Sequence, residues 1–554
     1  MTDTTRDAPR EHGRHNTARL LRSSGVVGLG TVLSRVSGLL RVQAIAYALG
    51  VSTLAGVYSY ANETPNMVYE LLIGGVLTAT LVPQFVRHFQ DEDEEATSAV
   101  FTVALLSLLA ITVVGIIIAP WIVKLYTIQV KGPGRADQQA LATAFLRVFM
   151  PQMLFYGLTA LATALLQARH RFGAAAFAPI INNFVVIAIF VSIPRLVGGP
   201  FTVQRLLHNN ALMLLIGLGT TAGIVAMGLV LLPALRAAKV RLRFLPAWRH
   251  DAVKRMLRLS GWTVGYVVAN QIALWYVLIY ANEQTGGAFA YLTAYIFFQL
   301  PYGLFAYPIM TAVAPELAAA GGRGDAPALR HRFARALRLA LTVIIPAAAV
   351  AVALARPIIV AGLQRGAFSA GNAALLADTL VGFAVGLPFF CTYLFSLRVF
   401  YSLDDTKTPF FLGCFENAVN ILLVLALTIF HSISIPGLAF CYSGAYAAGT
   451  VLNLTVLSRR RDVGSLRGRG MGLLAIRVMA VSMAGGAAAW FVGRTIGWAS
   501  SGAAIVSTAS GLLAAAAVIV GGLFLLRVDE FTEVLALIRR RRARRSAVSA
   551  GPST

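Results

Sequence analysis

The stretch TVLSRVSGLLRVQAIAYALG (residues 31–50) sets the class of this protein, because it is a long apolar segment that carries two arginines. A helix of about 20 mostly apolar residues spans the hydrocarbon core of a bilayer. Charged residues inside such a helix are costly and usually serve a function. The stretch therefore predicts a membrane helix with Arg35 near its middle and Arg41 closer to one end.

The whole chain has the same apolar character. Of its 554 residues, 57% are hydrophobic and 13% are charged, whereas soluble domains contain about 45–50% apolar and about 25% charged residues. This composition disfavours a soluble globule, a disordered chain and a nucleic-acid-binding domain. The three cysteines provide neither a disulfide framework nor a metal site. The net charge of +24 is assigned to basic loops at a membrane rather than to nucleic-acid binding.

Apolar segments of spanning length recur along nearly the whole chain, and we place fourteen of them. They predict an all-α polytopic membrane protein with about 14 transmembrane helices. The expected segments are 24–50, 55–88, 98–126, 140–168, 174–195, 209–235, 254–282, 287–319, 334–363, 373–402, 407–431, 434–458, 471–495 and 501–527.

Basic residues crowd into alternate connections between these segments. Cytoplasmic loops of membrane proteins carry an excess of lysine and arginine, so both termini are predicted to be cytoplasmic. The basic connections are the N-terminal tail, 169–171, 236–255, 323–335, 459–469 and the cluster at 539–545. The pair Asp404-Asp405, which precedes Pro409, is interpreted as a turn and helix start.

Weak matches at a spacing of 232 to 236 residues indicate an internal duplication. LLRSSG (20–25) resembles MLRLSG (256–261), and the pairs Pro65/Pro301, Asn182/Asn417 and Pro83/Pro315 follow in order. The duplication predicts two pseudo-symmetric six-helix lobes plus two C-terminal helices. The expected parts are a cytoplasmic basic tail (1–23), an N-lobe with helices 1–6 (24–235), a C-lobe with helices 7–12 (236–458), helices 13–14 (459–527) and a second cytoplasmic basic tail (528–554).

The candidate substrate site begins with Arg35 and Arg41. A guanidinium stays charged and forms forked hydrogen bonds to phosphate, so two arginines at membrane depth suggest an anionic substrate, above all a diphosphate. Six residues place them about 120° apart on an ideal helix, and Gly38 between them permits a bend or close packing. Glu63 and Glu70 are also assigned to this site. The alternative is that these carboxylates simply neutralise the arginines, or carry protons.

Further polar residues lie in the second half of the chain. Glu416 and Asn420, four residues apart with Asn417 between them, form a candidate Na⁺ or H⁺ site or else a helix-packing network. Asn270, Gln271 and Gln299 are candidates for lining the substrate cavity or for bonding across helices. No nucleotide loop, metal motif or nucleophile motif is present, so we expect no enzyme activity and no cofactor. Coupling to Na⁺, H⁺ or the membrane potential is expected instead.

Five stretches in order resemble the MurJ/MviN family of lipid II flippases, in the multidrug/oligosaccharidyl-lipid/polysaccharide exporter superfamily. They are residues 31–50, ETPNMVYELLIGGVLTATLVPQFV (63–86), ALLQARHRFGAAAFAPIINN (164–183), FFQLPYGLFAYPIMTAVAPELA (297–318) and VFYSLDDTKTPF (399–410). The resemblance implies fourteen helices, two lobes around a central cavity, and transport of the lipid-linked peptidoglycan precursor from the inner to the outer leaflet of the bacterial inner membrane. Arg35 and Arg41 fall on the two arginines that the family needs in its first helix.

The proteobacterial pattern has one Asp and two Arg residues at positions where this chain has Gly56, Tyr69 and Ile296. In this and in its Arg- and Ala-rich composition the chain resembles actinobacterial members. The cationic cavity is thus expected to be reduced to the first helix. Near Val277 it also lacks the Asp that ligates Na⁺ in some members.

Other functions stay open from the sequence. The chain could flip another polyprenyl-diphosphate glycan, act as a multidrug or cation antiporter of the same superfamily, or serve as a scaffold or enzyme in wall assembly. The expected partners are lipid II, membrane lipids and proteins of cell-wall synthesis and division, with no nucleic acid. Because the two lobes lie in one chain, a monomer is expected.

Overall fold

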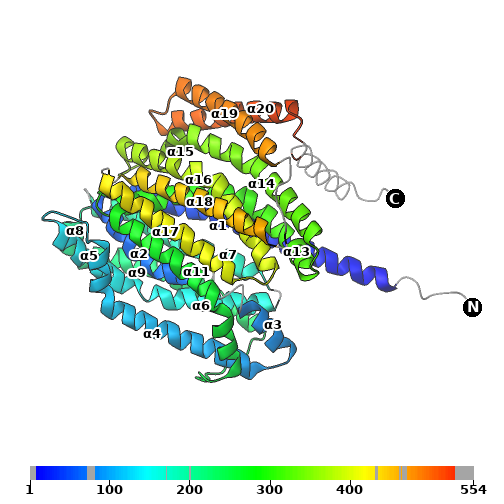
Figure 1. Ribbon diagram of the computed structural model, residues 1–554. Helices are drawn as coiled ribbons and strands as arrows, with labels where there is room; N and C mark the ends of the chain where they lie inside the picture. The colour runs from blue at the N-terminus through cyan, green and yellow to red at the C-terminus, as the bar shows by residue number, and fades with distance from the viewer. Residues whose placement is uncertain are drawn as a thin grey trace, which may run out of the picture. The chain divides into compact units, whose positions relative to one another are not determined.

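The computed structural model describes residues 8–70, 81–169, 171–198, 201–430, 434–460, 463, 471–528 and 530. Every regular element in these ranges is a helix (Figure 1). Thirteen helices there are long and apolar enough to span a membrane. The expected all-α polytopic fold is therefore confirmed. The second expected span (55–88) includes residues 71–80, and most of the C-terminal tail is 531–554, all of which lie outside the described residues.

The helices of the first half match the expected spans closely at most of their ends. They are α1 (Ala8–Leu49), α2 (Thr53–Glu70), α3 (Val82–Gln90), α4 (Glu94–Tyr126), α5 (Arg135–Phe149), α6 (Gln152–Ala168), α7 (Gly173–Val197), α8 (Val203–Leu207), α9 (Asn210–Leu229), α10 (Leu232–Ala237) and α11 (Asp251–Ala281). The helix α1 begins well before the expected residue 24, because the preceding Ala, Arg, Glu and Leu residues are good helix formers.

The helices of the second half follow in the same way. They are α12 (Gly287–Pro301), the π-helical turn η2 (Tyr302–Ala306), α13 (Tyr307–Gly322), α14 (Ala326–Ala353), α15 (Ala355–Leu363), α16 (Ala370–Ser402), α17 (Lys407–Phe430), α18 (Ile435–Arg459), α19 (Met471–Ile496) and α20 (Ser501–Leu525).

Four of the expected spans contain a local interruption of the helix, although 140–168, 209–235 and 287–319 each still correspond to one candidate membrane span. The span 287–319 contains η2, which directly follows Pro301, and the span 334–363 breaks at Leu354. The span 140–168 breaks at Met150–Pro151, and the span 209–235 breaks at Val230–Leu231. Proline lacks the N–H that would bond to the carbonyl four residues earlier, and its ring crowds that carbonyl. Pro357 acts in this way on Ala353, the last residue of α14.

The chain forms two compact units that divide after Gln271, within α11. In the first unit α1 packs along α7, α7 along α9, and α5 and α6 contact α2, α4 and α9. Small residues permit the closest approach, because they bring helix backbones together. A Cβ at Gly30 of α1 would lie 2.8 Å from the Cβ of Ala176 on α7.

Several of these pairings, though not that of α1 with α7, have counterparts among the helices of the second unit. Helix α16 packs against α12, α14 and α18, and α17 packs against α18. In chain order α16 takes the place of α5 and α6, so its contacts with α12, α14 and α18 correspond to their contacts with α2, α4 and α9. The pair α17 and α18 corresponds to the pair α7 and α9. The last helices, α19 and α20, lie side by side, with α19 also on α14 and α20 on α15 (Figure 1).

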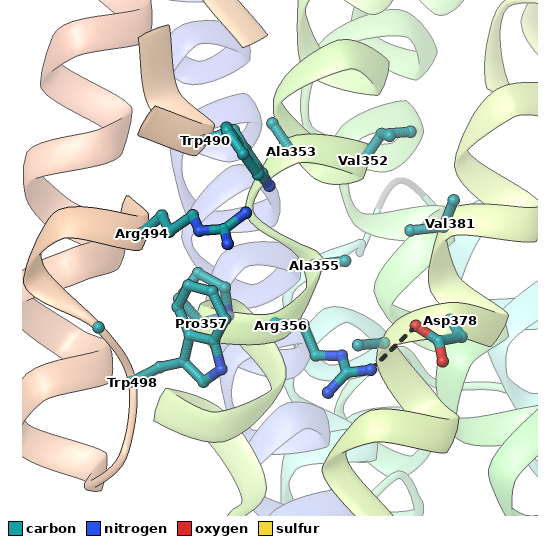
Figure 2. Close-up of a pocket in the computed structure, with 12 residues that line it drawn as sticks. Val352, Ala353, Ala355, Arg356, Pro357, Asp378, Val381, Trp490, Arg494 and Trp498 are labelled. Atoms are coloured by element: carbon teal, nitrogen blue, oxygen red, sulfur yellow. Dashed lines mark hydrogen bonds and ion pairs between the residues drawn. The ribbon is translucent and has the colours of Figure 1, made fainter. Parts of the chain in front are cut away.

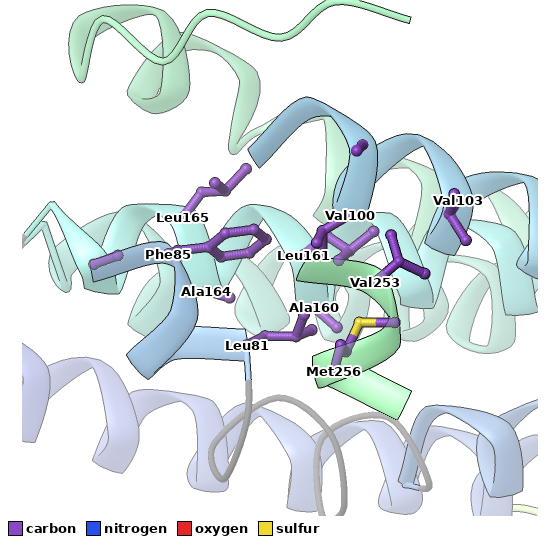
Figure 3. Close-up of a cluster of buried hydrophobic side chains, with 12 residues drawn as sticks. Leu81, Phe85, Val100, Val103, Ala160, Leu161, Ala164, Leu165, Val253 and Met256 are labelled. Atoms are coloured by element: carbon purple, nitrogen blue, oxygen red, sulfur yellow. The ribbon is translucent and has the colours of Figure 1, made fainter. Parts of the chain in front are cut away.

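An extended segment, residues 238–250, connects α10 to α11 and is bound to α4. The Arg243 N–H donates to the Ser98 hydroxyl at 3.1 Å, and the Leu245 N–H donates to the Thr102 hydroxyl at 3.1 Å. Figure 3 shows Val253 and Met256 of α11 among the buried side chains of α3, α4 and α6. These contacts join the start of α11 to the first unit, which places the division later than the lobe boundary expected at 235–236. That boundary, and the parts derived from the duplication, stay predictions.

Candidate functional site

Helix α1 presents the two candidate arginines with different exposure. Arg35 is exposed and Arg41 is half-buried, and the helix continues through Gly38 without interruption. A Cβ at Gly38 would lie 3.8 Å from the Nδ2 of Asn183 on α7, which is an ordinary van der Waals distance, so this packing does not require a glycine. The structure shows neither a break at Gly38 nor a contact too close for a larger residue.

Hydrogen bonds to α7 fix the rotation of α1. The Asn183 amide donates to the Ser37 hydroxyl at 2.9 Å and to the Ser34 carbonyl at 3.3 Å. Both Asn183 and Ser37 are buried. Because successive residues of a helix differ by about 100° in direction, anchoring Ser34 and Ser37 also sets the direction of Arg35.

The arginines have no close carboxylate partner within the described part of the chain. No Asp or Glu oxygen there lies within 4.0 Å of a guanidinium nitrogen of Arg35 or Arg41. The Nε–H of Arg41 is buried and donates to no protein acceptor among these residues. Arg41 acts electrostatically on Glu63, Tyr58 and Tyr156 over a longer distance. These guanidiniums are therefore available for an anion.

The two carboxylates of α2 have other surroundings. The Asn66 amide donates to Glu63 Oε1 at 3.1 Å. Glu70 is exposed and within electrostatic reach of Arg35. Tyr69, which stands where the proteobacterial pattern has an arginine, stacks on Tyr156 with 4.4 Å between ring centroids. An aromatic pair thus occupies this position in place of a third cation.

The candidate ion site lies within the second unit. Glu416, Asn417 and Asn420 on α17 are all buried, at 2%, 7% and 3% exposure. The Asn417 amide donates to the Gly413 carbonyl at 2.8 Å, which is a bond within its own helix. The Oδ1 of Asn420 is buried without a partner among the described residues. The side chain of Glu416 packs against Gly449 of α18, where an added Cβ would lie 3.2 Å away.

One set of polar residues was not predicted from the sequence: side chains of α18 that donate hydrogen bonds to backbone carbonyls of α16. The Ser443 hydroxyl donates to the Gly382 carbonyl at 2.6 Å, and the Thr450 hydroxyl donates to the Phe389 carbonyl at 2.9 Å. The Asn453 amide donates to the Tyr393 carbonyl at 3.3 Å, while its own Oδ1 is buried without a partner in the described residues. The spacing of 7 and 3 residues, which puts side chains on one helix face, was the available signal.

The other candidates are divided between the units. Asn270 and Gln271 are half-buried at the end of the first unit, and Gln299 is half-buried in the second. The Oε1 of Gln271 is buried and has no partner among the described residues. That these three amides line one cavity stays a prediction. Nowhere in the described ranges do three His, Cys, Asp or Glu side chains group as they would around a metal ion.

The chain shares its fold with solved structures of membrane transporters. A solved structure titled "Lipid II flippase MurJ, inward closed conformation" matches with a TM-score of 0.73 and 20% identity, over 91% of this chain and 99% of that one. An inward-facing multidrug resistance MATE transporter of the MOP superfamily matches with a TM-score of 0.61 and 14% identity, over 75% and 92% of the two chains. The chain is thus a multi-pass membrane protein with the fold of this superfamily.

The chain belongs to the MurJ family. The family described as "Lipid II flippase MurJ" matches residues 45–507. The chain is similar to "Probable lipid II flippase MurJ" of Rhizobium meliloti (strain 1021), at 28% identity over 76% of this chain and 77% of that protein. It is also similar to "Lipid II flippase MurJ" of Burkholderia cenocepacia, at 27% identity over 76% and 79%. Arg35 and Arg41 precede the matched residues, so their roles rest on their own surroundings.

Proposed function

We propose that this chain moves lipid II, the polyprenyl-diphosphate-linked peptidoglycan precursor, from the inner to the outer leaflet of the bacterial cytoplasmic membrane. Family membership supports this function. Transport by a protein with two similar halves proceeds by alternating access, in which the site opens to one side at a time. The chain acts as a monomer with both termini in the cytoplasm, and it carries out no covalent chemistry.

One observation carries the substrate assignment. Arg35 and Arg41 lie on a membrane-spanning helix, and neither has a carboxylate within ion-pair distance among the described residues. An uncompensated cation at that depth is costly unless an anion or water meets it. We assign the diphosphate to these two guanidiniums. The apolar polyprenyl tail stays in lipid, while the sugar–peptide head crosses within the protein.

We further propose that an ion gradient drives the cycle through Glu416. This carboxylate is buried on α17, close to amide groups that include the unpartnered Oδ1 of Asn420. Carboxylate and amide oxygens suit Na⁺, and a buried carboxylate also suits H⁺. Binding of the ion would neutralise the charge in one state of the cycle and not in the other, which is what coupling requires.

The direct test is transport by the purified protein in liposomes. Fluorescent lipid II placed in one leaflet should become accessible to a membrane-impermeant reagent in the other at a rate that depends on the protein. The same vesicles should show no protein-dependent movement of a labelled phosphatidylcholine. Absence of lipid II movement under every imposed Na⁺, H⁺ and voltage gradient would contradict the proposal, and export of a cationic dye in its place would favour an antiporter.

A further inference from the structure

A cavity of about 540 Å³ lies in the second unit, and none of the candidate substrate residues described above lines it. It lies where α14 ends and α15 begins, between α16 and the end of α19. Its charged and aromatic lining comprises Arg356, Asp378, Trp490, Arg494 and Trp498, and the rest is largely small and apolar. Figure 2 shows the Arg494 side chain extending beneath Trp490 and that of Arg356 extending toward Asp378.

The cavity has an uncompensated positive charge. Arg356 Nη2 lies 3.5 Å from Asp378 Oδ1, and both side chains are about half exposed, at 44% and 55%. The guanidinium of Arg494 lies 5.0 Å from the ring centroid of Trp490. In the part of the chain that the structure describes, no carboxylate lies within ion-pair distance of Arg494. Two cations therefore face one anion, and Arg494 is free to bind another.

The cavity lies near helix ends, and the ends of spanning helices are where a bilayer meets water. Helices α14 and α19 end at Ala353 and Ile496, and α16 begins at Ala370. Asp378 follows Ala370 by eight residues, which is about 12 Å along a helix. Tryptophan gathers at the membrane interface, and arginine reaches from apolar surroundings to polar headgroups there.

An apolar strip leads away from the charged end of the cavity. Val381 of α16 lines the cavity, and Val385 and Phe389 follow at successive turns on the same side. Both are open to the surroundings of the protein, at 48% and 41% exposure. A molecule with an anionic head in the cavity would lay a hydrocarbon chain along this strip.

We propose that this cavity binds the headgroup of an anionic phospholipid, with Arg494 and Arg356 donating to the phosphate oxygens. A guanidinium group can donate two parallel hydrogen bonds to the oxygens of one phosphate, and such charge-assisted hydrogen bonds are stronger than those between neutral groups. Trp490 and Trp498 flank the glycerol, and one acyl chain follows Val381, Val385 and Phe389. The site uses neither Arg35 nor Arg41 and is independent of the proposed transport.

The test is lipid binding by the full-length protein in detergent, followed by native mass spectrometry. Phosphatidylglycerol and phosphatidylcholine with the same acyl chains are titrated separately. The double variant Arg356→Gln/Arg494→Gln should bind phosphatidylglycerol about tenfold or more weakly, since it loses charged hydrogen bonds. The matched control is Arg477→Gln, which removes an exposed arginine of α19 that does not line the cavity and should leave binding unchanged.

A variant that is expected to bind phosphatidylglycerol more tightly distinguishes an effect on the site from damage to the fold. Asp378→Asn releases Arg356 from its ion pair, so phosphatidylglycerol should bind more tightly than to the unmodified protein. Equal weakening by Arg477→Gln, equal binding of phosphatidylcholine, or no gain with Asp378→Asn would each overturn the proposal. Displacement of phosphatidylglycerol by millimolar inorganic phosphate would assign the cavity to free phosphate and overturn the lipid assignment.

Discussion

The Asn183 amide on α7 donates a hydrogen bond to the Ser37 hydroxyl on α1 at 2.9 Å. This contact joins two membrane helices at a level between the two candidate substrate arginines. It also sets the direction of both guanidiniums, because that direction depends on the rotation of α1 about its axis.

Asn183→Leu should lower stability and impair transport together. The variant keeps a similar side-chain volume but leaves the Ser37 hydroxyl with only its bond to the Ser34 carbonyl. Loss of a buried hydrogen bond costs about 1–3 kcal/mol, measurable as a lower thermal midpoint in detergent. Ser192→Ala on the exposed side of α7 removes only a bond within its own helix and is the control. Normal flipping by a destabilised Asn183→Leu would separate this contact from function.

Arg35→Ala and Arg41→Ala should each abolish or strongly reduce lipid II movement at normal abundance. Truncation of a charged hydrogen-bonding partner costs about 2–5 kcal/mol of binding. Arg35→Lys should retain part of the activity, because it keeps the charge but not the forked geometry. The measurements are lipid II affinity and flipping rate in liposomes.

A double variant distinguishes substrate binding from neutralisation of the α2 carboxylates. If Arg35 or Arg41 only balances Glu63 or Glu70, then Arg35→Ala with Glu70→Gln, or Arg41→Ala with Glu63→Gln, should restore flipping. We expect no rescue, because neither pair is within ion-pair distance in the described residues. Restored transport in correctly inserted protein would reject the diphosphate assignment.

Glu416→Gln should uncouple transport from the driving ion without unfolding the protein. The side chain keeps its shape against Gly449 while losing its charge, and removal of a buried charge is often neutral or stabilising. Flipping rates measured with and without imposed Na⁺ and H⁺ gradients should become independent of the gradient that drives the unmodified protein. Unchanged gradient dependence would place the coupling ion elsewhere.

The turn between α16 and α17 should contribute stability in a pH-dependent way. Burial alone would raise the pKa of Asp405, but bonds from the Thr408 N–H (2.9 Å) and hydroxyl (2.7 Å), and from the Arg460 guanidinium, outweigh it and lower that pKa. The stabilisation is therefore complete above the unfolded pKa, about 3.9, and is lost as the pH falls through the lower folded pKa.

Asp405→Asn tests this linkage. At neutral pH it should destabilise the protein by about 1–3 kcal/mol, seen as a lower thermal midpoint. The difference from the unmodified protein should stay constant between neutral pH and about pH 5 and shrink below about pH 4, once the native carboxyl is protonated. Asp404→Asn, whose side chain lacks these bonds, is the control. A difference that grows on acidification would have the wrong sign.

The sequence by itself determined the class of fold and pointed to the candidate site residues. Apolar segments of spanning length predicted the helices, because a bilayer leaves few other ways to satisfy the backbone. Arg35, Arg41 and Glu416 were identifiable since a charge is costly at membrane depth whatever surrounds it. The interpretation of Asp404-Asp405 as a turn and helix start is confirmed, because Asp405 bonds to the Thr408 N–H in the first turn of α17.

Only the tertiary structure decided which groups meet. Asn183 and Ser37 are 146 residues apart, and Asn453 and Tyr393 are 60 apart, so no local pattern could pair them. The union of Arg356, Asp378 and Arg494 in one cavity likewise depends on three separate helices. Helix periodicity fixes the direction of a side chain relative to its own helix, but packing between helices selects its partner. The local sequence therefore determines which segments form helices, whereas the sites that these helices form depend on their packing.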